Sequence, residues 1–281
     1  MPRPPQARSG CSCQSPDNTS SPSCGPTPPP ASSGKRGFLQ DLLAAAMAAV
    51  ALPATAAGIN PPGFQPPRRA GEEGKRYGML VDLRRCIGCQ ACTVSCSLEN
   101  LPPIGQFRTT VLQYEINKDD GSAPAMVSLP RLCNHCEEPP CVPVCPVQAT
   151  FQREDGIVLV DNERCVGCGY CVQACPYDAR FINHETQTAD KCTFCEHRLE
   201  VGLLPACVES CVGGARVIGD LNDPGSEINR RMQAHNQAHP DGIKVLKPDM
   251  KTQPRVFYIG LPDEFVNGVD GQASVRLVAE Y

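Results

Sequence analysis

The segment Cys86–Cys96, CIGCQACTVSC, places four cysteines within eleven residues in the spacing C-x2-C-x2-C-x3-C. The segment Cys165–Cys175, CVGCGYCVQAC, repeats this spacing. Because the first three thiolates of each segment lie within seven residues, one short loop can bind three corners of a cubane iron–sulfur cluster. The fourth cysteine then points away from the loop and is available to a neighbouring cluster. The two segments therefore predict a fold built around iron–sulfur clusters.

Sixteen of the 19 cysteines fall into four groups of four. Group one is Cys86, Cys89, Cys92 and Cys96; group two is Cys133, Cys136, Cys141 and Cys145; group three is Cys165, Cys168, Cys171 and Cys175; and group four is Cys192, Cys195, Cys207 and Cys211. Group two has the spacing C-x2-C-x4-C-x3-C, and group four has eleven residues in its central gap. The other three cysteines, Cys11, Cys13 and Cys24, lie in a stretch rich in serine and proline. Only the sixteen grouped cysteines have the spacing of metal ligands.

Three kinds of cysteine chemistry compete for these groups: disulfides, structural zinc and iron–sulfur clusters. Disulfide scaffolds are typical of short secreted chains and do not need a repeated C-x2-C-x2-C spacing. Structural zinc uses two separated C-x2-C pairs, which group four alone resembles. Groups one and three do not fit zinc well, since three of their thiolates are packed so closely. We therefore predict four [4Fe–4S] clusters bound by all sixteen thiolates, with disulfides and zinc as the alternatives.

The chain contains an internal duplication. Leu80-Val81-Asp82 before group one matches Leu159-Val160-Asp161 before group three, at an offset of 79 residues. Groups two and four also correspond, because Pro139-Pro140-Cys141-Val142 matches Pro205-Ala206-Cys207-Val208. The order a–b–a′–b′ indicates an ancestral two-cluster unit that is used twice.

Proline positions indicate how the groups pair. Proline follows the last cysteine of groups two and three, as Pro146 and Pro176, and it is missing after Cys96 and Cys211. A proline at this position belongs to the signature of two-cluster bacterial ferredoxins, in which the last cysteine binds the other cluster. We therefore predict that group two pairs with group three and that group one pairs with group four, one pair nested inside the other. The alternative pairs group one with two and group three with four.

The nested pairing predicts four ligand sets. The first set is Cys86, Cys89, Cys92 and Cys211; the second is Cys96, Cys192, Cys195 and Cys207; the third is Cys133, Cys136, Cys141 and Cys175; and the fourth is Cys145, Cys165, Cys168 and Cys171. An inner two-cluster unit then covers residues 133–175, an outer unit combines 77–132 with 176–225, and residues 226–281 form a C-terminal extension.

The predicted fold class is α+β: duplicated bacterial-ferredoxin-like two-cluster units, rich in loops, with short strands and small helices. Strands are predicted at Tyr77–Asp82, Phe107–Ile116, Gly156–Val160 and Arg255–Gly260, and a helix at Glu227–Gln237 with Ser226 as its cap. Glycine between the first two cysteines of groups one and three, Gly88 and Gly167, can adopt a positive φ and lets backbone N–H groups approach the cluster sulfurs.

Composition also bears on the core. The chain has 24 glycines, 29 prolines, no tryptophan and only 5% aromatic residues. These values predict that clusters, rather than a conventional hydrophobic core, fill the interior, and that the cluster-free chain is largely unfolded. The net charge of −4 argues against general nucleic-acid binding. No uninterrupted apolar run reaches 18 residues, so we predict no membrane-spanning segment.

The N-terminal part of the sequence has the features of an export signal. Residues 1–34 are rich in Pro, Ser and Thr and are predicted to be disordered. Lys35-Arg36-Gly37-Phe38-Leu39-Gln40, the apolar run Leu42–Leu52 and a cleavage site after Ala56 or Ala57 resemble a twin-arginine signal, with a lysine in place of the first arginine. An amphipathic helix packed on the body is the alternative. Residues 58–76 are predicted to be a linker, and the mature protein is predicted to be periplasmic.

The four groups resemble the four-cluster electron-transfer subunits of molybdopterin oxidoreductases, the family of polysulfide and dimethyl sulfoxide reductases. The resemblance covers roughly residues 35–265 and is carried mainly by Arg76–Cys96, Leu129–Val158 and Asp178–Asp220. The segments between the groups are most similar to the tetrathionate-reducing branch. The resemblance implies anaerobic respiration, in which an integral membrane subunit oxidises quinol, this chain relays electrons, and a molybdopterin subunit reduces tetrathionate to thiosulfate. Other reductase complexes, a stand-alone polyferredoxin or a metal-stabilised interaction module are the alternatives.

No catalytic residues are predicted, because the sequence shows no nucleophile–base pattern and the cysteines of the body are all assigned as ligands. Thiolates fill every cluster corner, so His135, His184 and His197 are predicted to surround the clusters or lie at the surface. Six basic residues lie close to ligands in sequence and can raise cluster potentials, although half or more of them are expected to be ordinary surface residues: Arg84, Arg85, Arg131, Arg164, Arg180 and Lys191.

Overall fold

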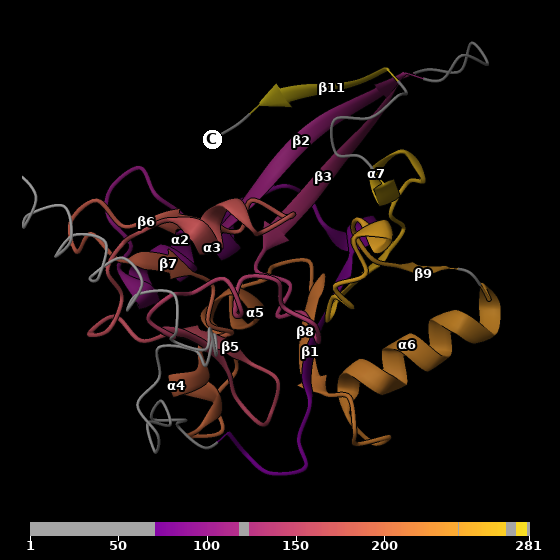
Figure 1. Cartoon of the computed structure of the whole chain (residues 1–281). Helices are drawn as coiled ribbons and strands as arrows, with labels where there is room; N and C mark the ends of the chain where they lie inside the picture. The colour runs from indigo at the N-terminus through magenta and orange to yellow at the C-terminus, as the bar shows by residue number, and fades with distance from the viewer. Residues whose placement is uncertain (1–70, 118–123, 241, 268–273, 280–281) are drawn as a thin grey trace, which may run out of the picture. The chain divides into compact units, whose positions relative to one another are not determined.

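The computed structural model describes residues 71–117, 124–240, 242–267 and 274–279 (Figure 1). The predicted disordered segment 1–34, the export signal 35–57 and residues 58–70 of the linker lie outside the described residues. The described end of the linker is joined to the rest of the chain by hydrogen bonds: the backbone N–H of Arg76 donates to the Asp220 carboxylate at 2.7 Å, and that of Tyr77 donates to the Asp155 carbonyl at 3.1 Å.

A four-stranded sheet in the order β8-β1-β10-β9 joins distant parts of the sequence. β1 (Tyr77–Asp82) runs antiparallel to β8 (Arg216–Asp220) and parallel to β10 (Val256–Ile259), and the two-residue β9 (Ile243–Lys244) borders β10. Because side chains alternate along a strand, β1 contributes to two different buried clusters. Tyr77, Met79 and Val81 enter the main core, whereas Leu80 packs in a second cluster.

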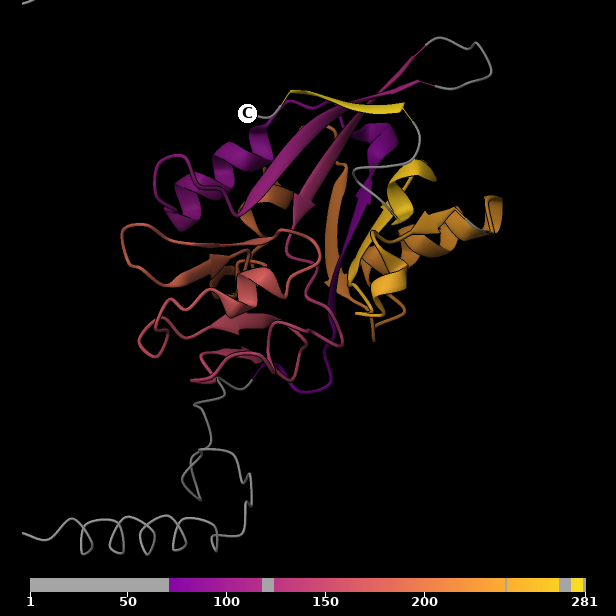
Figure 2. The same cartoon turned by 45° about the horizontal axis from the view of Figure 1, so that its top comes forward.

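Helix α6 (Glu227–Ala238) packs against this sheet (Figure 2). Ile228 is the buried residue of the helix, and it packs with Leu80, Val217 and Ile259. The Ser226 side chain accepts a hydrogen bond from the Asn229 backbone N–H at the N-terminus of the helix, as an N-cap does. The C-terminal extension thus supplies both a central strand of the sheet and the helix that packs on it.

A three-stranded antiparallel sheet, in the order β11-β2-β3, forms a long arm in Figure 1. Its strands are β2 (Thr109–Asn117), β3 (Ala125–Leu132) and β11 (Ser274–Ala279). Pro130, which has no N–H, lies in β3 at the edge of this sheet, where the missing donor costs least. The buried side chains Val111, Tyr114 and Ile116 of β2 reach the main core.

The cysteine-rich part consists of loops, two small hairpins and short helices. The hairpins pair β4 (Thr150–Gln152) with β5 (Val158–Val160), and β6 (Arg180–Ile182) with β7 (Ala189–Lys191). The helical elements of the described chain, besides α6, are η1 (Leu83–Arg85), α2 (Ala91–Asn100), α3 (Tyr170–Gln173), α4 (Glu196–Leu199), α5 (Ala206–Glu209), η2 (Pro248–Met250) and α7 (Glu264–Asn267). The described fold is therefore α+β and rich in loops, as predicted.

The predicted elements are found close to their predicted places. The strand at Tyr77–Asp82 has the predicted bounds, and the helix predicted at Glu227–Gln237 ends one residue later. The other three predicted strands correspond to β2, β5 and β10 with shifts of one or two residues at their ends. β3, β4, β6, β7, β8, β9 and β11 were not predicted. No helix in the described ranges is long and apolar enough to cross a bilayer.

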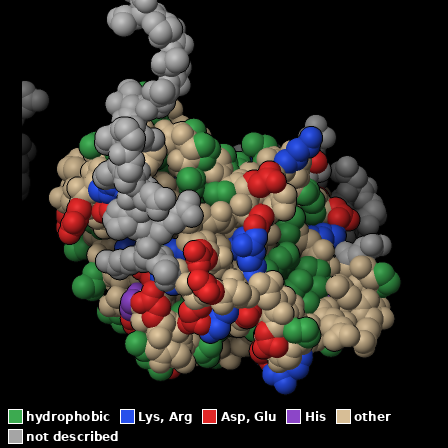
Figure 3. All heavy atoms as spheres, turned by 60° about the horizontal axis from the view of Figure 1, so that its bottom comes forward, with side chains coloured by type: hydrophobic (Ala, Val, Ile, Leu, Met, Phe, Trp, Pro, Cys, Tyr) green, Lys and Arg blue, Asp and Glu red, His purple; other side chains and the backbone are tan. Residues whose placement is uncertain are grey.

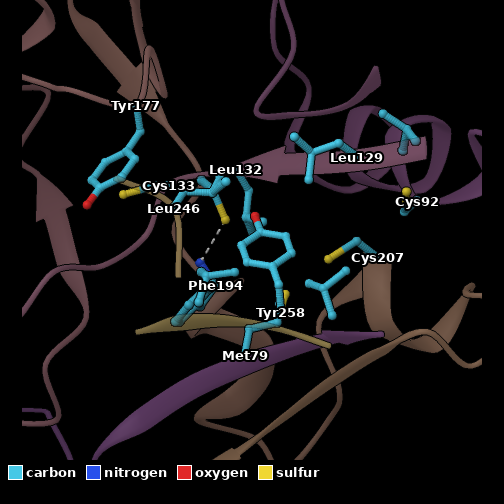
Figure 4. Close-up of a cluster of buried hydrophobic side chains, with 14 of the residues drawn as sticks. Met79, Cys92, Leu129, Leu132, Cys133, Tyr177, Phe194, Cys207, Leu246 and Tyr258 are labelled. Carbon is cyan, nitrogen blue, oxygen red and sulfur yellow. Dashed lines mark hydrogen bonds between the residues drawn. The ribbon is translucent and has the colours of Figure 1, made fainter. Parts of the chain in front are cut away.

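The prediction that the chain lacks a conventional hydrophobic core is wrong in part. The main cluster of buried side chains contains Met79, Leu129, Phe194, Tyr258 and Phe265, each 1% exposed or less. Cysteines are interspersed with these side chains: Figure 4 shows Cys92, Cys133 and Cys207 among the buried aliphatic and aromatic residues. The predicted ligand cysteines and ordinary core residues thus share one interior.

Candidate iron–sulfur cluster sites

The loops that carry the first cysteines of groups one and three have the same backbone shape. Gly88 has φ of 68° and Gly167 has φ of 67°, so both adopt the positive φ that the sequence predicted. A Cβ atom at Gly167 would overlap the carbonyl oxygen of Gln187, and one at Gly88 would lie 2.7 Å from the Ser128 hydroxyl. Glycine is therefore required at both positions by conformation and by space.

Helices begin just before the third cysteine of three groups. Cys92, Cys171 and Cys207 are each the second residue of a helix, in α2, α3 and α5. All three cysteines are buried. This placement points backbone N–H groups of the first turn towards the region of the thiols, where they favour negative charge.

Two of the predicted ligand sets each line a cavity. Cys86, Cys89, Cys92 and Cys211 line one cavity, which Arg216 also borders. Cys96, Cys192, Cys195 and Cys207 line a second cavity, together with Asn100 and Thr109. In both cavities the fourth cysteine comes from the group at the other end of the cysteine-rich region. Groups one and four are therefore neighbours in space.

The third predicted set brings Cys175 of group three next to the first three cysteines of group two. Burial and the neighbouring Cys133, Cys141 and Cys175 raise the pKa of the Cys136 thiol to about 12. Burial likewise raises the pKa of Cys141 to about 11, with Cys133 and Cys175 adding to the effect and the nearby Arg180 opposing it. Groups two and three are thus adjacent at this site.

The members of the fourth predicted set are related less directly. Cys171 belongs to a buried cluster with Val158, Ala189 and Cys141, Cys165 packs against this cluster, and the backbone N–H of Ala189 donates to Cys165 Sγ at 3.3 Å. Cys168 is exposed and Cys145 is half-buried. Their assignment to this set rests on the duplication of the sequence and on the pairing of groups two and three.

The ligand sets also approach one another. Burial, followed by Cys195 and Cys92, raises the pKa of Cys207, so the first and second sets are close. Burial, followed by Cys96, Cys207 and Cys133, raises the pKa of Cys192, so the second and third sets are close. In the same region the rings of His135 and Phe194 stack with a centroid distance of 3.8 Å.

Backbone N–H groups donate to several thiol sulfurs. The residue four positions after the last cysteine of a group is the donor in two cases: Ala149 donates to Cys145 Sγ and Ala215 to Cys211 Sγ, both at 3.2 Å. The Asn100 side-chain amide, four positions after Cys96, lies 3.6 Å from Cys96 Sγ. Hydrogen bonds of this kind stabilise cluster thiolates and raise cluster potentials.

The residues present fit [4Fe–4S] clusters. All sixteen grouped cysteines are free thiols, and buried donors that face them, Arg180 Nε and Arg216 Nη1, have no hydrogen-bond partner among the described residues. Thiols with raised pKa values stay protonated at neutral pH, so ligands must lose protons when a cluster binds. In the described part of the chain no group of three or more His, Cys, Asp or Glu residues is arranged to hold a single metal ion.

The histidines and basic residues singled out in the sequence occupy varied places. His135 is fully buried and accepts a hydrogen bond from the Val158 N–H at Nδ1, whereas His184 and His197 are exposed. Arg84 pairs with Asp82, and Arg131 lies 3.7 Å from the Asp178 carboxylate. Unlike Arg84, the cations Arg180, Lys191 and Arg216 are buried, and each has a cysteine thiol as a neighbour.

Arg216 was missed by the sequence analysis, although a signal was present. It follows Cys211 by five residues, as Arg180 follows Cys175, and both arginines are preceded by alanine. Aligning the ends of groups three and four would have identified the pair.

Comparisons with known proteins agree with this geometry. Two family models, each described as a 4Fe-4S dicluster domain, match residues 85–149 and 124–221. The B subunit of tetrathionate reductase from Salmonella typhimurium is 62% identical over 248 residues, which cover 88% of this chain and 96% of the relative. The B subunit of tetrathionate reductase from Archaeoglobus fulgidus is 44% identical over 68% of this chain and 84% of the relative. The B chain of polysulfide reductase from Wolinella succinogenes is 40% identical over 66% and 94%, respectively.

Proposed function

This chain belongs to the family of four-cluster iron–sulfur subunits that includes the B subunit of tetrathionate reductase and the B chain of polysulfide reductase, and we propose that it relays electrons within a tetrathionate reductase complex. Four [4Fe–4S] clusters, when bound, supply one-electron carriers. The 62% identity to a tetrathionate reductase subunit, over nearly its whole length, is the observation that carries the proposal.

We assign the clusters to the four ligand sets of the nested pairing. The cavity shared by Cys86, Cys89, Cys92 and Cys211 supports the first set, and the cavity shared by Cys96, Cys192, Cys195 and Cys207 supports the second. Cys133 and Cys175 both raise the pKa values of Cys136 and Cys141, which supports the third set. The fourth set, Cys145, Cys165, Cys168 and Cys171, follows from the duplication.

The exposure of the first and fourth ligand sets supports a relay. Cys89 of the first set and Cys168 of the fourth are exposed, whereas all four cysteines of the second set are buried. Ile87 and Val166, which occupy equivalent positions next to these ends, are 67% and 63% exposed. Exposed apolar side chains beside an outer cluster are suitable contacts for a partner protein. We propose that electrons enter at one of these ends and leave at the other.

The proposed partners are a membrane subunit that oxidises quinol and a molybdopterin subunit that reduces tetrathionate to thiosulfate. On the face in Figure 3, acidic and basic side chains are interspersed rather than forming one basic surface, so this face offers no footprint for nucleic acid. A relay in a polysulfide, dimethyl sulfoxide or other reductase complex is the second candidate, and the 40% identity to a polysulfide reductase chain favours it over unrelated functions.

Quinol-dependent reduction of tetrathionate by the co-expressed complex is expected to require this chain. In a matched complex that lacks the chain, the quinol-dependent rate should fall at least about tenfold. Tetrathionate reduction with a reduced viologen dye should be kept, because the dye can deliver electrons directly to the catalytic subunit. An undiminished quinol-dependent rate without the chain would rule out the relay. Reduction of polysulfide or dimethyl sulfoxide, with none of tetrathionate, would overturn the substrate assignment.

We also propose that a twin-arginine-like signal exports the chain to the periplasm with its clusters already bound. The supporting residues are the basic pair Lys35-Arg36, the apolar run that follows and the small residues at Ala54–Ala57. Export of a folded protein would protect sixteen thiols from oxidation outside the cytoplasm.

Replacing Lys35 and Arg36 together by glutamine is expected to reduce the periplasmic amount of the chain at least about tenfold, as measured by immunoblotting of cell fractions. The matched control replaces the later basic pair, Arg68 and Arg69, by glutamine and should leave export unchanged. Equal export of the Lys35/Arg36 variant and the wild type would show that this pair is not a signal.

A further inference from the structure

Two arginines lie at the same distance after the last cysteine of groups three and four, and both are buried. Arg180 begins β6 five residues after Cys175, and Arg216 begins β8 five residues after Cys211. They are 4% and 3% exposed, respectively. An arginine is rarely buried without an anionic partner, because removing its charge from water is costly.

Each guanidinium donates a hydrogen bond to a threonine that is distant in sequence. Arg216 Nη2 donates to Thr109 Oγ1 at 3.0 Å, and Thr109 in turn donates to the Arg131 carbonyl at 2.7 Å. Arg180 Nη1 donates to Thr150 Oγ1 at 3.2 Å. Both threonines begin a strand, β2 or β4, so their positions are fixed by sheet hydrogen bonds.

Arg216 lies among thiols of two different ligand sets. Cys207 and Cys192 of the second set and Cys92 of the first set are its neighbouring thiols, and Thr109, to which Arg216 donates, lines the cavity of the second set. Arg216 also borders the cavity of the first set. Its guanidinium therefore lies between the first and second proposed clusters.

Arg180 has the same relation to the inner unit. Its Nη2 donates to Cys141 Sγ at 3.0 Å, and Cys133 also lies near it, so it contacts the third set. Cys171 of the fourth set is a further nearby thiol. Arg180 therefore lies between the third and fourth proposed clusters.

Neither arginine is neutralised by a carboxylate. Within the described ranges, no ion pair with Asp or Glu includes Arg180 or Arg216. Arg180 Nε and Arg216 Nη1 also lack hydrogen-bond partners in the described chain. Arg153, which is similarly buried, instead pairs with Asp155 and Glu200. The anionic thiolates are thus the available counter-charges for Arg180 and Arg216.

We propose that Arg180 and Arg216 are buried counter-charges, each shared by the two clusters of one unit, that raise the reduction potentials of both. This inference rests on the proposed function, since it requires that the chain binds four clusters. A cluster becomes more negative when it accepts an electron, and a fixed positive charge in a poorly solvated interior stabilises that reduced state. The arginines themselves change neither protonation nor oxidation state.

The test is a redox titration of the purified, cluster-loaded full chain, with dithionite as reductant, ferricyanide as oxidant and electron paramagnetic resonance as the readout. In Arg216→Gln, two of the four midpoint potentials are expected to fall, with at least about a tenfold lower reduced-to-oxidised ratio at a fixed potential, or about 59 mV for a one-electron couple. Arg180→Gln should lower the other two, and the double variant should lower all four. Arg216→Lys and Arg180→Lys, which keep the charge, should change each ratio by less than about threefold.

Controls separate this inference from the proposed function. Arg230→Gln removes an exposed charge that pairs with Glu227 on α6, and it should move no potential. Iron and sulfide analysis of the wild type tests the function, because fewer than four clusters would contradict the function itself. Full cluster content with unchanged potentials in the glutamine variants would contradict only the arginine proposal, as would equal shifts in the lysine and glutamine variants. If a glutamine variant loses its clusters, the lysine variant at the same position is the test. A lysine variant that keeps its clusters with wild-type potentials supports the proposal, and a lysine variant that also loses its clusters contradicts it.

Discussion

Chelation of iron from the purified chain under anaerobic, reducing conditions is expected to unfold most of residues 77–225 and to abolish the cooperative thermal transition. Two strands of the four-stranded sheet lie close in sequence to the cysteine groups: β1 ends at Asp82, four residues before Cys86, and β8 begins five residues after Cys211. Ligation free energy is folding free energy when the unfolded chain has no preformed site. A structural zinc site supplies an apparent value of about 10–16 kcal/mol. The net stability of a whole domain is only about 5–15 kcal/mol.

The buried aromatic and aliphatic side chains oppose this expectation, because they would still favour a folded state after chelation. Thiols are also reasonable core residues, since free cysteine behaves as a small hydrophobic side chain. However, Arg180 and Arg216 would lose their anionic neighbours when the thiols become protonated, and each would leave a buried, unpaired charge. We expect this cost to outweigh the remaining packing.

Circular dichroism and differential scanning calorimetry measure the outcome. The matched control is the same protein carried through the procedure without chelator, which should keep its transition. Addition of iron and sulfide to the chelated chain should restore the transition. A cooperative, native-like melt of the iron-free chain would show that the hydrophobic core alone holds the fold, and the prediction would be abandoned.

The sequence predicted those elements whose signals are local. β1 was found at its full length because an apolar run precedes the first cysteine group, and α6 was found because Ser226 supplies a cap. The positive φ of Gly88 and Gly167 follows from the tight spacing of the cysteines around them. In each case a few neighbouring residues determine the conformation.

The core was underestimated because composition does not show which residues lie together. Residues 71–281 contain 12 of the 14 aromatic residues, a share only slightly above that of the whole chain. Six of the aromatic residues are buried in the described part: Tyr77, Tyr114, Tyr177, Phe194, Tyr258 and Phe265. These six side chains lie in one cluster of buried residues, and this clustering is not visible in a composition count.

The strands that were missed depend on distant partners. β8 pairs with β1 across about 140 residues of sequence, and it begins with a charged residue, Arg216, that alone suggests a surface. Its burial makes sense only after the cysteine groups bring anionic ligands around it. Such long-range effects are not visible in a local sequence pattern.

Serine in place of Cys89 and Cys211 tests the nested ligand pairing, and the double variant is expected to lose no more iron than either single variant. Both thiolates line the same cavity, so each single substitution should remove or damage the same cluster, about four of about sixteen irons. Once that cluster is lost, the second substitution has no further cluster to affect. Iron and acid-labile sulfide per chain are the quantities to measure.

The matched double variant, Cys168→Ser with Cys211→Ser, gives the opposite expectation. Under the nested pairing these cysteines belong to the fourth and first sets, so the two losses should add to about eight irons. If group three instead pairs with group four, Cys168 and Cys211 bind one cluster, and this variant should lose only about four irons while Cys89→Ser with Cys211→Ser loses about eight. Under the alternative pairing, each double variant thus gives the iron loss that the nested pairing predicts for the other. Because all three substitutions replace a cysteine by serine, a general loss of stability would affect both double variants alike, whereas only the ligand pairing makes them differ.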